Sequence, residues 1–370
     1  MKRVKFGDIV REVKIQVDRS NNPYLHYVAG DHMDSMDLTI RRKGSFATDD
    51  VGPAFIRIFK PGQVLYGSRR TYLKKIAVAD FEGICSNTTF VLETKDSNVF
   101  LQELLPFIML SESFTKWSIS HSKGSTNPYV LFSDLANYEF TLPSLSEQKV
   151  LADNLWAAYR VKESYKKLLT ATDDMLKAKF QEMFGDPVKN EKKWYVKSLS
   201  EVAPESASNH KLTGTVWNLN LDMIESGTGL LIEKVYIPHE SLNSVVPFDE
   251  ENVLYSKLRP YLNKVIIPAA KGYATTELVP LRPDTTLLNM KFLSYILRSE
   301  QFVAFANGIA TGTKMPRIPM AELRKFNCIL PPLPLQQQFV EIATQAEATK
   351  ESLRKSIENI DQVIKSLINQ

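Results

Sequence analysis

The sequence lacks several features that would place or classify a protein at once. No apolar run reaches the roughly 20 residues that a membrane-spanning helix requires, and the opening residues MKRVKFGDIV lack the apolar core of a signal peptide. The two cysteines, Cys85 and Cys328, lie far apart with no second ligand nearby, so we interpret both as thiols in apolar settings. We therefore expect a cytoplasmic protein that does not engage a membrane.

Nucleotide-binding and metal-binding patterns are also missing. Glycine is sparse, at 15 residues, and Gly227-Thr228-Gly229 is too short for a dinucleotide fingerprint; no Gly-x-x-x-x-Gly-Lys loop occurs. The histidines show neither His-Glu-x-x-His spacing nor another ligand pattern; they are His26, His32, His121, His210 and His239. The sequence therefore predicts no metal and no cofactor on this chain.

Two short strings share residues with catalytic motifs. Asn127-Pro128-Tyr129 matches part of the Asn-Pro-Pro-Tyr loop of amino-methyltransferases, and Asp80 with Glu93-x-Lys95 matches a nuclease core. The second Pro of the first motif is absent, and the matching places in the other half of the chain read Met315-Pro316-Arg317 and Arg282-Pro283-Asp284. Because such short strings arise freely by chance, we predict no catalytic residue.

What the sequence does contain is an internal repeat. Val64-Leu65-Tyr66 recurs as Val253-Leu254-Tyr255, and at the same offset Arg70 meets Arg259. After a slip of one residue the register continues with Ser111 and Ser299, Phe114 and Phe302, Gly124 and Gly312, Pro128 and Pro316, and Leu142-Pro143 and Leu330-Pro331. With 370 residues, 44% of them hydrophobic, the chain is long enough for two domains that each bury a core. We interpret it as two copies of one unit.

Each copy combines a mixed α and β part with a long helical run. Short apolar runs predict strands at residues 75–79 and 264–267, and helical spacing predicts helices at about 100–117 and 287–306. After each Leu-Pro, apolar residues in steps of three and four predict a helix of about 40 residues. The first stripe is Leu151, Leu155, Ala158, Tyr165, Leu169, Leu176 and Met183, interrupted by Lys162, Thr172 and Lys179, and the second is Ile342, Ala346, Leu353, Ile357, Ile360, Ile364 and Leu367.

Helices of this length outgrow a single domain, so we expect them to pair with each other. An antiparallel pairing would give an approximate two-fold axis. The predicted fold class is α+β, with two similar globular domains separated by two long, antiparallel, coiled-coil-like helices. The predicted boundaries are residues 1–143 for the first domain, 144–186 for the central helix, 187–330 for the second domain and 331–370 for the C-terminal helix.

Basic residues gather in turns of both copies, although the net charge of +4 alone decides nothing. Cations suit phosphates, and arginine also suits guanine edges in the major groove. The predicted DNA-binding residues are Arg69, Arg70, Lys74, Lys75, Lys123, Ser125 and Asn127 in the first copy, and Lys257, Arg259, Lys264, Thr313, Lys314 and Arg317 in the second. The alternative for each is a solvated turn between strands. The tyrosines of these turns are interpreted as core or sheet-face residues: Tyr66, Tyr72, Tyr255 and Tyr261.

At this point the chain resembles a known family over essentially its whole length. Leu142-Pro143-Ser144-Leu145-Ser146-Glu147-Gln148 and Leu330-Pro331-Pro332-Leu333-Pro334-Leu335-Gln336-Gln337 resemble the Leu-Pro-Pro-Leu-x-Glu-Gln signature that opens the helical regions of type I restriction-modification specificity subunits. Lys179-Phe180-Gln181-Glu182-Met183-Phe184-Gly185-Asp186-Pro187 resembles that family's link into its second recognition domain.

The resemblance implies a non-catalytic subunit whose two target-recognition domains read the two halves of a split target in double-stranded DNA. It implies that the helices set the unread gap and dock two methyltransferase subunits, that restriction motor-nuclease subunits join them, and that S-adenosylmethionine, ATP and Mg belong to these partners. Such a protein would work in a prokaryotic cytoplasm, at the nucleoid. The halves differ strongly outside the shared positions, so the target is expected to be asymmetric. A free-standing DNA-binding protein and a coiled-coil scaffold remain the alternatives.

Overall fold

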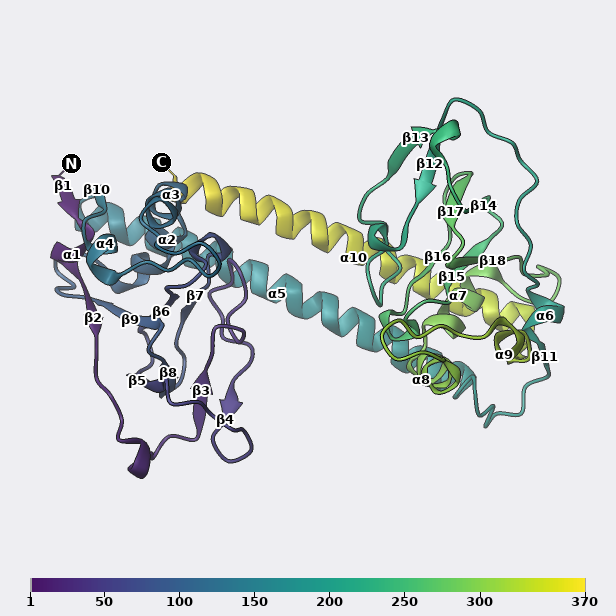
Figure 1. Cartoon of the computed structure of the whole chain (residues 1–370), viewed down its shortest axis with the longest axis horizontal. Coiled ribbons are helices and arrows are strands. Elements are labelled where there is room, and N and C mark those ends of the chain that lie inside the picture. The colour runs from purple at the N-terminus through teal and green to yellow at the C-terminus, as the bar shows by residue number, and fades with distance from the viewer. Residues whose placement is uncertain (1, 370) are drawn as a thin grey trace. The chain divides into compact units, whose positions relative to one another are not determined.

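The computed structural model describes residues 2–369, which divide into two compact units (Figure 1). Unit 1 holds the residues up to Lys166 together with those from Arg354 onward, and unit 2 holds Lys167–Leu353. The division falls inside both long helices, α5 (Leu145–Phe184) and α10 (Leu333–Ile368), so each unit contains part of each helix. In the described part of the chain, no helix is both long and apolar enough to cross a bilayer.

Among its described residues, unit 1 contains two four-stranded sheets and four short helices. One sheet has the order β2-β9-β6-β7, with bounds Val10–Val13, Thr89–Thr94, Val64–Gly67 and Ile76–Val78. The other has the order β4-β3-β8-β5, with bounds Gly44–Ser45, His26–Val28, Gly83–Ser86 and Phe55–Phe59. β1 (Lys2–Lys5) pairs with β10 (Glu139–Leu142). The helices are α1 (Phe6–Ile9), α2 (Leu105–Leu110), α3 (Glu112–Ser120) and α4 (Phe132–Ala136), with 3-10 turns η1 (Arg19–Asn21), η2 (Thr71–Leu73) and η3 (Gln102–Leu104).

Unit 2 repeats this plan with one strand fewer in one sheet. Its sheets are β16-β15-β18 (Val265–Ile266, Val253–Ser256, Leu278–Leu281) and β13-β12-β17-β14 (Val235–Pro238, Thr215–Leu219, Gly272–Thr275, Val245–Phe248). β11 (Val196–Ser198) pairs with β19 (Asn327–Ile329). The helices are α6 (Leu199–Val202), α7 (Met290–Arg298), α8 (Glu300–Ile309) and α9 (Met320–Arg324), with 3-10 turns η4 (Leu221–Met223), η5 (His239–Ser241) and η6 (Pro260–Leu262). The predicted repeat and mixed α and β content are confirmed.

The helical segments predicted at about 100–117 and 287–306 are each broken by a serine. Ser111 ends α2 and caps α3, because its hydroxyl accepts a hydrogen bond from the amide of Phe114 at 3.2 Å. Ser299 does the same between α7 and α8, accepting from Phe302 at 3.2 Å. Both phenylalanine rings are fully buried. The cap therefore turns the chain at the point where a ring must enter the core.

A buried glutamine attaches the start of each long helix to its own unit. The Gln148 amide accepts from the backbone N–H of Leu101 at 3.0 Å and donates to the carbonyls of Val99 and Pro143. Gln336 makes the same three kinds of bond, accepting from the N–H of Asn289 at 2.8 Å and donating to two carbonyls. Gln336 is therefore the counterpart of Gln148, and Leu335 stands where the first copy has Glu147.

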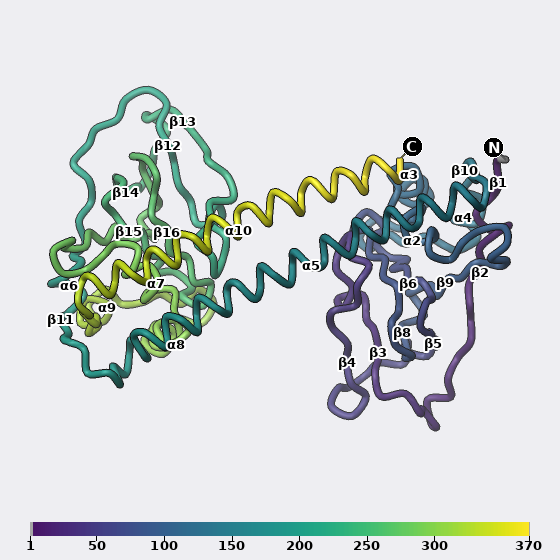
Figure 2. Tube along the Cα trace, turned by 180° about the vertical axis from the view of Figure 1, so that it is seen from behind, coloured from purple at the N-terminus to yellow at the C-terminus, as the bar shows by residue number. Residues whose placement is uncertain are grey.

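Within each unit the two long helices lie side by side and antiparallel (Figure 2). In unit 1, Lys162 of α5 forms an ion pair with Asp361 of α10 at 2.5 Å. In unit 2 the roles are exchanged, and Lys350 of α10 pairs with Asp173 of α5 at 2.5 Å. Both lysine side chains are almost buried, so each needs its acidic partner. The predicted antiparallel pairing is confirmed, and Lys162, which interrupts the apolar stripe, takes part in the helix contact.

The remaining core follows the sequence pattern. Cys85 and Cys328 are free thiols with no exposed surface, as predicted, and burial raises the pKa of each to about 12. Pro334 lies in the first turn of α10. Proline is tolerated there because first-turn N–H groups have no partner inside the helix.

Candidate nucleic-acid interface

The first basic segment, turn 1 (residues 68–75), connects β6 to β7 through a tight 3-10 turn. Arg70 and Lys74, on either side of η2, adopt left-handed backbone conformations with φ of 50° and 47°. A left-handed conformation costs a non-glycine residue about 1 kcal/mol or more, so surrounding contacts must hold it. Arg69 and Arg70 are exposed, whereas Lys74 and Lys75 are half-buried.

A second segment, loop 1 (residues 121–129), supplies those contacts. The Arg70 amide donates to the carbonyl of Pro128 at 2.7 Å, and the Arg70 Nε donates to Asn127 Oδ1 at 3.2 Å. Lys123 and Tyr129 exchange backbone hydrogen bonds of 2.7 and 2.9 Å, and the left-handed Gly124 (φ 87°) allows this tight loop. The structure therefore brings together the two segments of unit 1 in which the sequence predicts DNA-binding residues.

Unit 2 builds the same arrangement from turn 2 (residues 257–264) and loop 2 (residues 311–317). The Arg259 amide donates to the carbonyl of Pro316 at 2.7 Å, and Arg259 and Asn263 take the two left-handed positions, with φ of 50° and 48°. Thr311 and Arg317 exchange backbone hydrogen bonds of 2.9 Å across the left-handed Gly312. The frame of the candidate interface is thus the same in both units.

The predicted site residues differ in how free their side chains are. Those exposed on the loops are Lys123, Ser125, Thr313, Lys314 and Arg317, and those half-buried are Asn127, Lys257, Arg259 and Lys264. Within residues 2–369 the structure gives no ion pair to Arg69, Lys257 or Lys314, so these charges are available to a phosphate.

Other predicted cations already have partners inside their own unit. Lys75 donates to the carbonyl of Gly30, and Lys264 donates to that of Leu221 at 2.6 Å. Lys123 pairs with Asp134 at 3.1 Å.

Two more of these cations have pKa values that are shifted by a neighbouring charge or by burial. Arg317 pairs with Glu277 at 2.9 Å, and this hydrogen bond and charge raise the pKa of the guanidinium. Burial lowers the pKa of Lys74, an effect that the nearby Glu112 opposes. To contact DNA, Arg317 would have to release Glu277.

The tyrosines separate into two classes. Tyr66 and Tyr255 are core residues, as predicted, with burial raising the pKa of Tyr66 to about 12. The same prediction was wrong for Tyr72 and Tyr261, which are 54% and 53% exposed at the tips of turns 1 and 2. The signal that could have found them is their position in a turn between cations, where no strand alternation buries a side chain. Exposed aromatic rings beside cations suit contact with a nucleic acid backbone or base.

The strings that resemble catalytic motifs are engaged in structural contacts. Glu93 accepts hydrogen bonds from Arg11 and Gln63, at 2.8 and 2.7 Å, while Lys95 donates to the carbonyl of Gly7. Burial tends to raise the pKa of Glu93, but these two donors lower it overall. No cluster of metal-ligating side chains occurs among the described residues.

Comparison with protein families gives two matches on one chain. The family model described as the type I restriction modification DNA specificity domain matches residues 55–170 and again residues 191–362. Each match contains one turn and one loop of the candidate interface.

Relatives with similar sequences include two specificity subunits. The chain is 23% identical over 298 residues to the type I restriction enzyme EcoDI specificity subunit of Escherichia coli, which covers 68% of this chain and 66% of that protein. It is 25% identical over 315 residues to the type I restriction enzyme MjaVIII specificity subunit of Methanocaldococcus jannaschii, covering 78% and 73%. This chain thus spans about two thirds of the length of the EcoDI subunit.

Solved structures share the fold over nearly the whole chain. The S subunit of a type I restriction-modification system from M. genitalium gives a TM-score of 0.59 at 12% identity, covering 99% of this chain and 94% of that one. A chain from a study of complex assembly and conformational transition of the type I R-M system gives 0.56 at 20% identity, covering 99% and 96%.

Proposed function

The chain belongs to the family of type I restriction-modification DNA specificity domains, and we propose that its two units read the two halves of one split, asymmetric target in double-stranded DNA. Turn 1 with loop 1 would read one half, and turn 2 with loop 2 the other. The long helices would set the unread gap and dock two methyltransferase subunits, which restriction motor-nuclease subunits join. S-adenosylmethionine, ATP and Mg would be bound by these partners, in the cytoplasm where the DNA lies.

The observation that carries the proposal is one frame built twice with different side chains. The backbone bond from Arg70 to Pro128 recurs from Arg259 to Pro316 at the same 2.7 Å. On this shared frame, Asn127 is replaced by Met315, and Lys74 is replaced by Asn263. Equivalent positions that present different donors and acceptors would contact different base edges, so two unequal half-sites are expected.

The chemistry of the exposed groups fits a duplex. Arg69 and Lys314 can neutralise phosphates, which gives affinity without sequence preference. A guanidinium such as that of Arg70, held at a fixed angle, can donate two hydrogen bonds to a guanine edge. The sequence preference would thus depend on the side chains whose orientation the frame fixes.

The experiment that tests the proposal is single-molecule methylation sequencing of DNA from cells that express this chain with its candidate methyltransferase partner. The control is cells that express the partner alone. We expect a split motif that is methylated only when the chain is present, and this would reveal both half-sites. No new modification, with a partner shown to be active beside another specificity subunit, would favour a DNA-binding protein that acts alone or a helical scaffold.

A further inference from the structure

A short segment in unit 1 lies between turn 1 and the long helix α5. The amide of Met36 donates to the carbonyl of Lys74 at 3.1 Å, and an isolated β-bridge pairs Ser35 with Lys75. Met36 also has a left-handed backbone, with φ of 57°. Residues 35–39 thus lie directly against the strained end of turn 1.

The next residues of this segment bind one tyrosine of α5. The Tyr159 hydroxyl donates to Asp37 Oδ1 at 2.6 Å and accepts from the amide of Leu38 at 2.8 Å. The Thr39 hydroxyl lies 3.0 Å from the hydroxyl oxygen of Tyr159. Tyr159 and Asp37 are each only 6% exposed, so these bonds are shielded from water.

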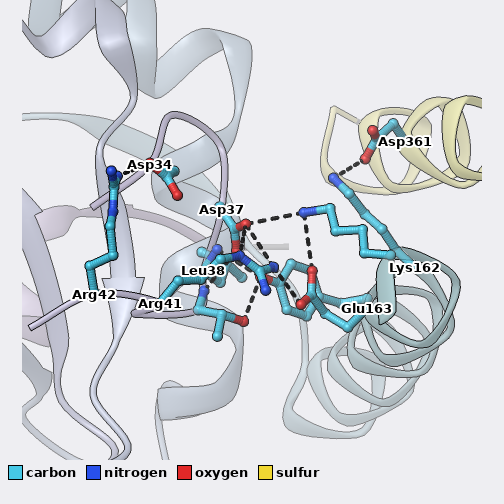
Figure 3. A network of polar contacts seen from close by, with 11 residues as sticks. Asp34, Asp37, Leu38, Arg41, Arg42, Lys162, Glu163 and Asp361 are labelled. Carbon is cyan, nitrogen blue, oxygen red and sulfur yellow. Dashed lines mark hydrogen bonds and ion pairs between the residues drawn. The ribbon is translucent and has the colours of Figure 1, made fainter. Parts of the chain in front are cut away.

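Charged groups close the contact on the helix side (Figure 3). Arg41 forms ion pairs with Asp37 at 2.9 Å and with Glu163 of α5 at 2.5 Å, and Lys166 lies 3.1 Å from both carboxylates. Burial alone would raise the pKa of Asp37, but the bonds from Tyr159, the Thr39 amide and Lys166 hold it well below its ordinary value. The carboxylate is therefore charged and fully engaged at neutral pH.

Unit 2 makes an equivalent connection from the same helix position with different chemistry. The amide of Gly227 donates to the carbonyl of Asn263 at 3.1 Å, as Met36 does to Lys74. The neighbouring Thr228 carbonyl accepts from Arg298 of α7, whose guanidinium lies 3.9 Å from Glu347 of α10. Glu347 follows Gln336 by the same number of residues as Tyr159 follows Gln148.

Other side chains of α7 hold Glu347 in place. Lys291 pairs with it at 2.5 Å, and the Tyr295 hydroxyl donates to it at 2.7 Å. Burial favours the neutral acid, but these two donors lower the pKa of Glu347 overall. The carboxylate is thus fixed opposite Arg298, and through Arg298 it reaches the segment beside turn 2.

We propose that Tyr159 and Glu347 are positioning residues: through Tyr159, α5 holds turn 1 in the conformation that reads DNA, and through Glu347, α10 does the same for turn 2. The inference rests on the proposed function, since it assigns each residue to one half-site. Left-handed residues persist only where their surroundings hold them. Turn 1 depends on this support more than turn 2, because glycine in the place of Met36 carries no Cβ penalty.

The test uses the full chain with Tyr159→Phe, which removes one hydroxyl and leaves the ring. Hydrogen exchange in the absence of DNA should accelerate by about tenfold at the Leu38 amide and in residues 70–75, the effect expected from losing one buried hydrogen bond. Residues 259–264 should exchange as before. Glu347→Gln should accelerate hydrogen exchange in residues 259–264, by a smaller factor, and leave exchange in residues 70–75 as before. Tyr165→Phe, the same substitution on the same helix outside this cluster, should change neither turn.

The second readout is discrimination of each half-site by the assembled complex. Tyr159→Phe should weaken selection at one half-site by about threefold to thirtyfold and leave the other unchanged. Equal loss at both halves, or unchanged exchange in residues 70–75, would overturn the positioning role, as would altered exchange with intact discrimination. A wild-type complex that selects no split target would overturn the proposed function itself, and it would do so before any substitution is made.

Discussion

Turns 1 and 2 share a backbone and differ in what holds their arginines. The Arg70 Nε donates to Asn127, whereas the Arg259 Nε is buried with no hydrogen-bond partner among the described residues. Met315 stands where the first copy has Asn127, and a thioether is a poor acceptor. The comparison shows that the frame and the orientation of the side chains on it are set by different residues.

The short helices behind the turns differ in a related way. In unit 1, α1 and α4 meet through Gly7 and Ala136, so closely that a Cβ on Gly7 would lie 2.5 Å from the Cβ of Ala136. In unit 2 the same places carry Ser200 and Arg324, and a hollow of about 400 Å³ lies between α6 and α9. Arg324 pairs there with Glu205 at 2.7 Å. One fold therefore tolerates both a tight and an open contact at this point.

The largest expected effect separates the two turns by function. Arg70→Ala should weaken selection at one half-site by about 1 to 3 kcal/mol, because it removes a guanidinium that suits a guanine edge. Arg259→Ala should do the same at the other half-site only. Methylation of targets altered in one half at a time measures both. Equal loss at both halves from either substitution would contradict the assignment of one reader to each half.

The tight helix contact should make unit 1 more sensitive to added volume than unit 2. Gly7→Ala should destabilise unit 1 by about 1 to 3 kcal/mol, because backbone and Cβ atoms of Ala136 leave no space for a methyl group. Ser200→Thr, which adds one methyl group at the matching place, is the control and should cost much less, because the hollow between α6 and α9 has space for it. Urea unfolding, monitored by hydrogen exchange in each unit, measures the stability lost in the two variants. Comparable losses would show that the two contacts are equally adaptable.

Acid should act on the two connections through different residues, because unit 1 has its carboxylate, Asp37, in the segment beside turn 1, whereas unit 2 has Thr228 there and its carboxylate, Glu347, on the helix. The pKa of folded Asp37 lies below its ordinary value of 3.8, so its stabilisation is present above that pH and is lost as the pH falls below it. Asp37→Asn should remove up to about 1.4 kcal/mol per pH unit of this dependence. Unfolding free energies between pH 5 and pH 2 measure the slope. An unchanged slope would mean that Asp37 is not the group responsible.

Much of this architecture could be predicted because it follows from periodic or repeated signals. The apolar steps of three and four predicted both long helices, and the shared register predicted that turn and loop recur together. Ser111 and Ser299 were visible as a repeated pair, and their capping role follows from residue type.

The details of the interface could not be predicted, because they depend on contacts distant in sequence. Lys264 donates to the Leu221 carbonyl, 43 residues away, and no local pattern indicates this. The exposure of Tyr72 depends on the left-handed residues beside it, a conformation that arginine and lysine rarely adopt. Tyr159 belongs to an amphipathic helix in sequence, and only the fold brings Asp37 to it.

The smallest expected effect exchanges the residues that distinguish the two arginines. Asn127→Met should free the Arg70 Nε and reduce selection at one half-site by about 1 kcal/mol, the contribution of a single hydrogen bond. Met315→Asn should give the buried Arg259 Nε an acceptor and sharpen selection at the other half-site by a similar amount. Met315→Leu, which keeps the size and adds no acceptor, should leave that half-site unchanged. If Leu and Asn acted alike, packing rather than the missing acceptor would control Arg259, and the difference between the turns would have another cause.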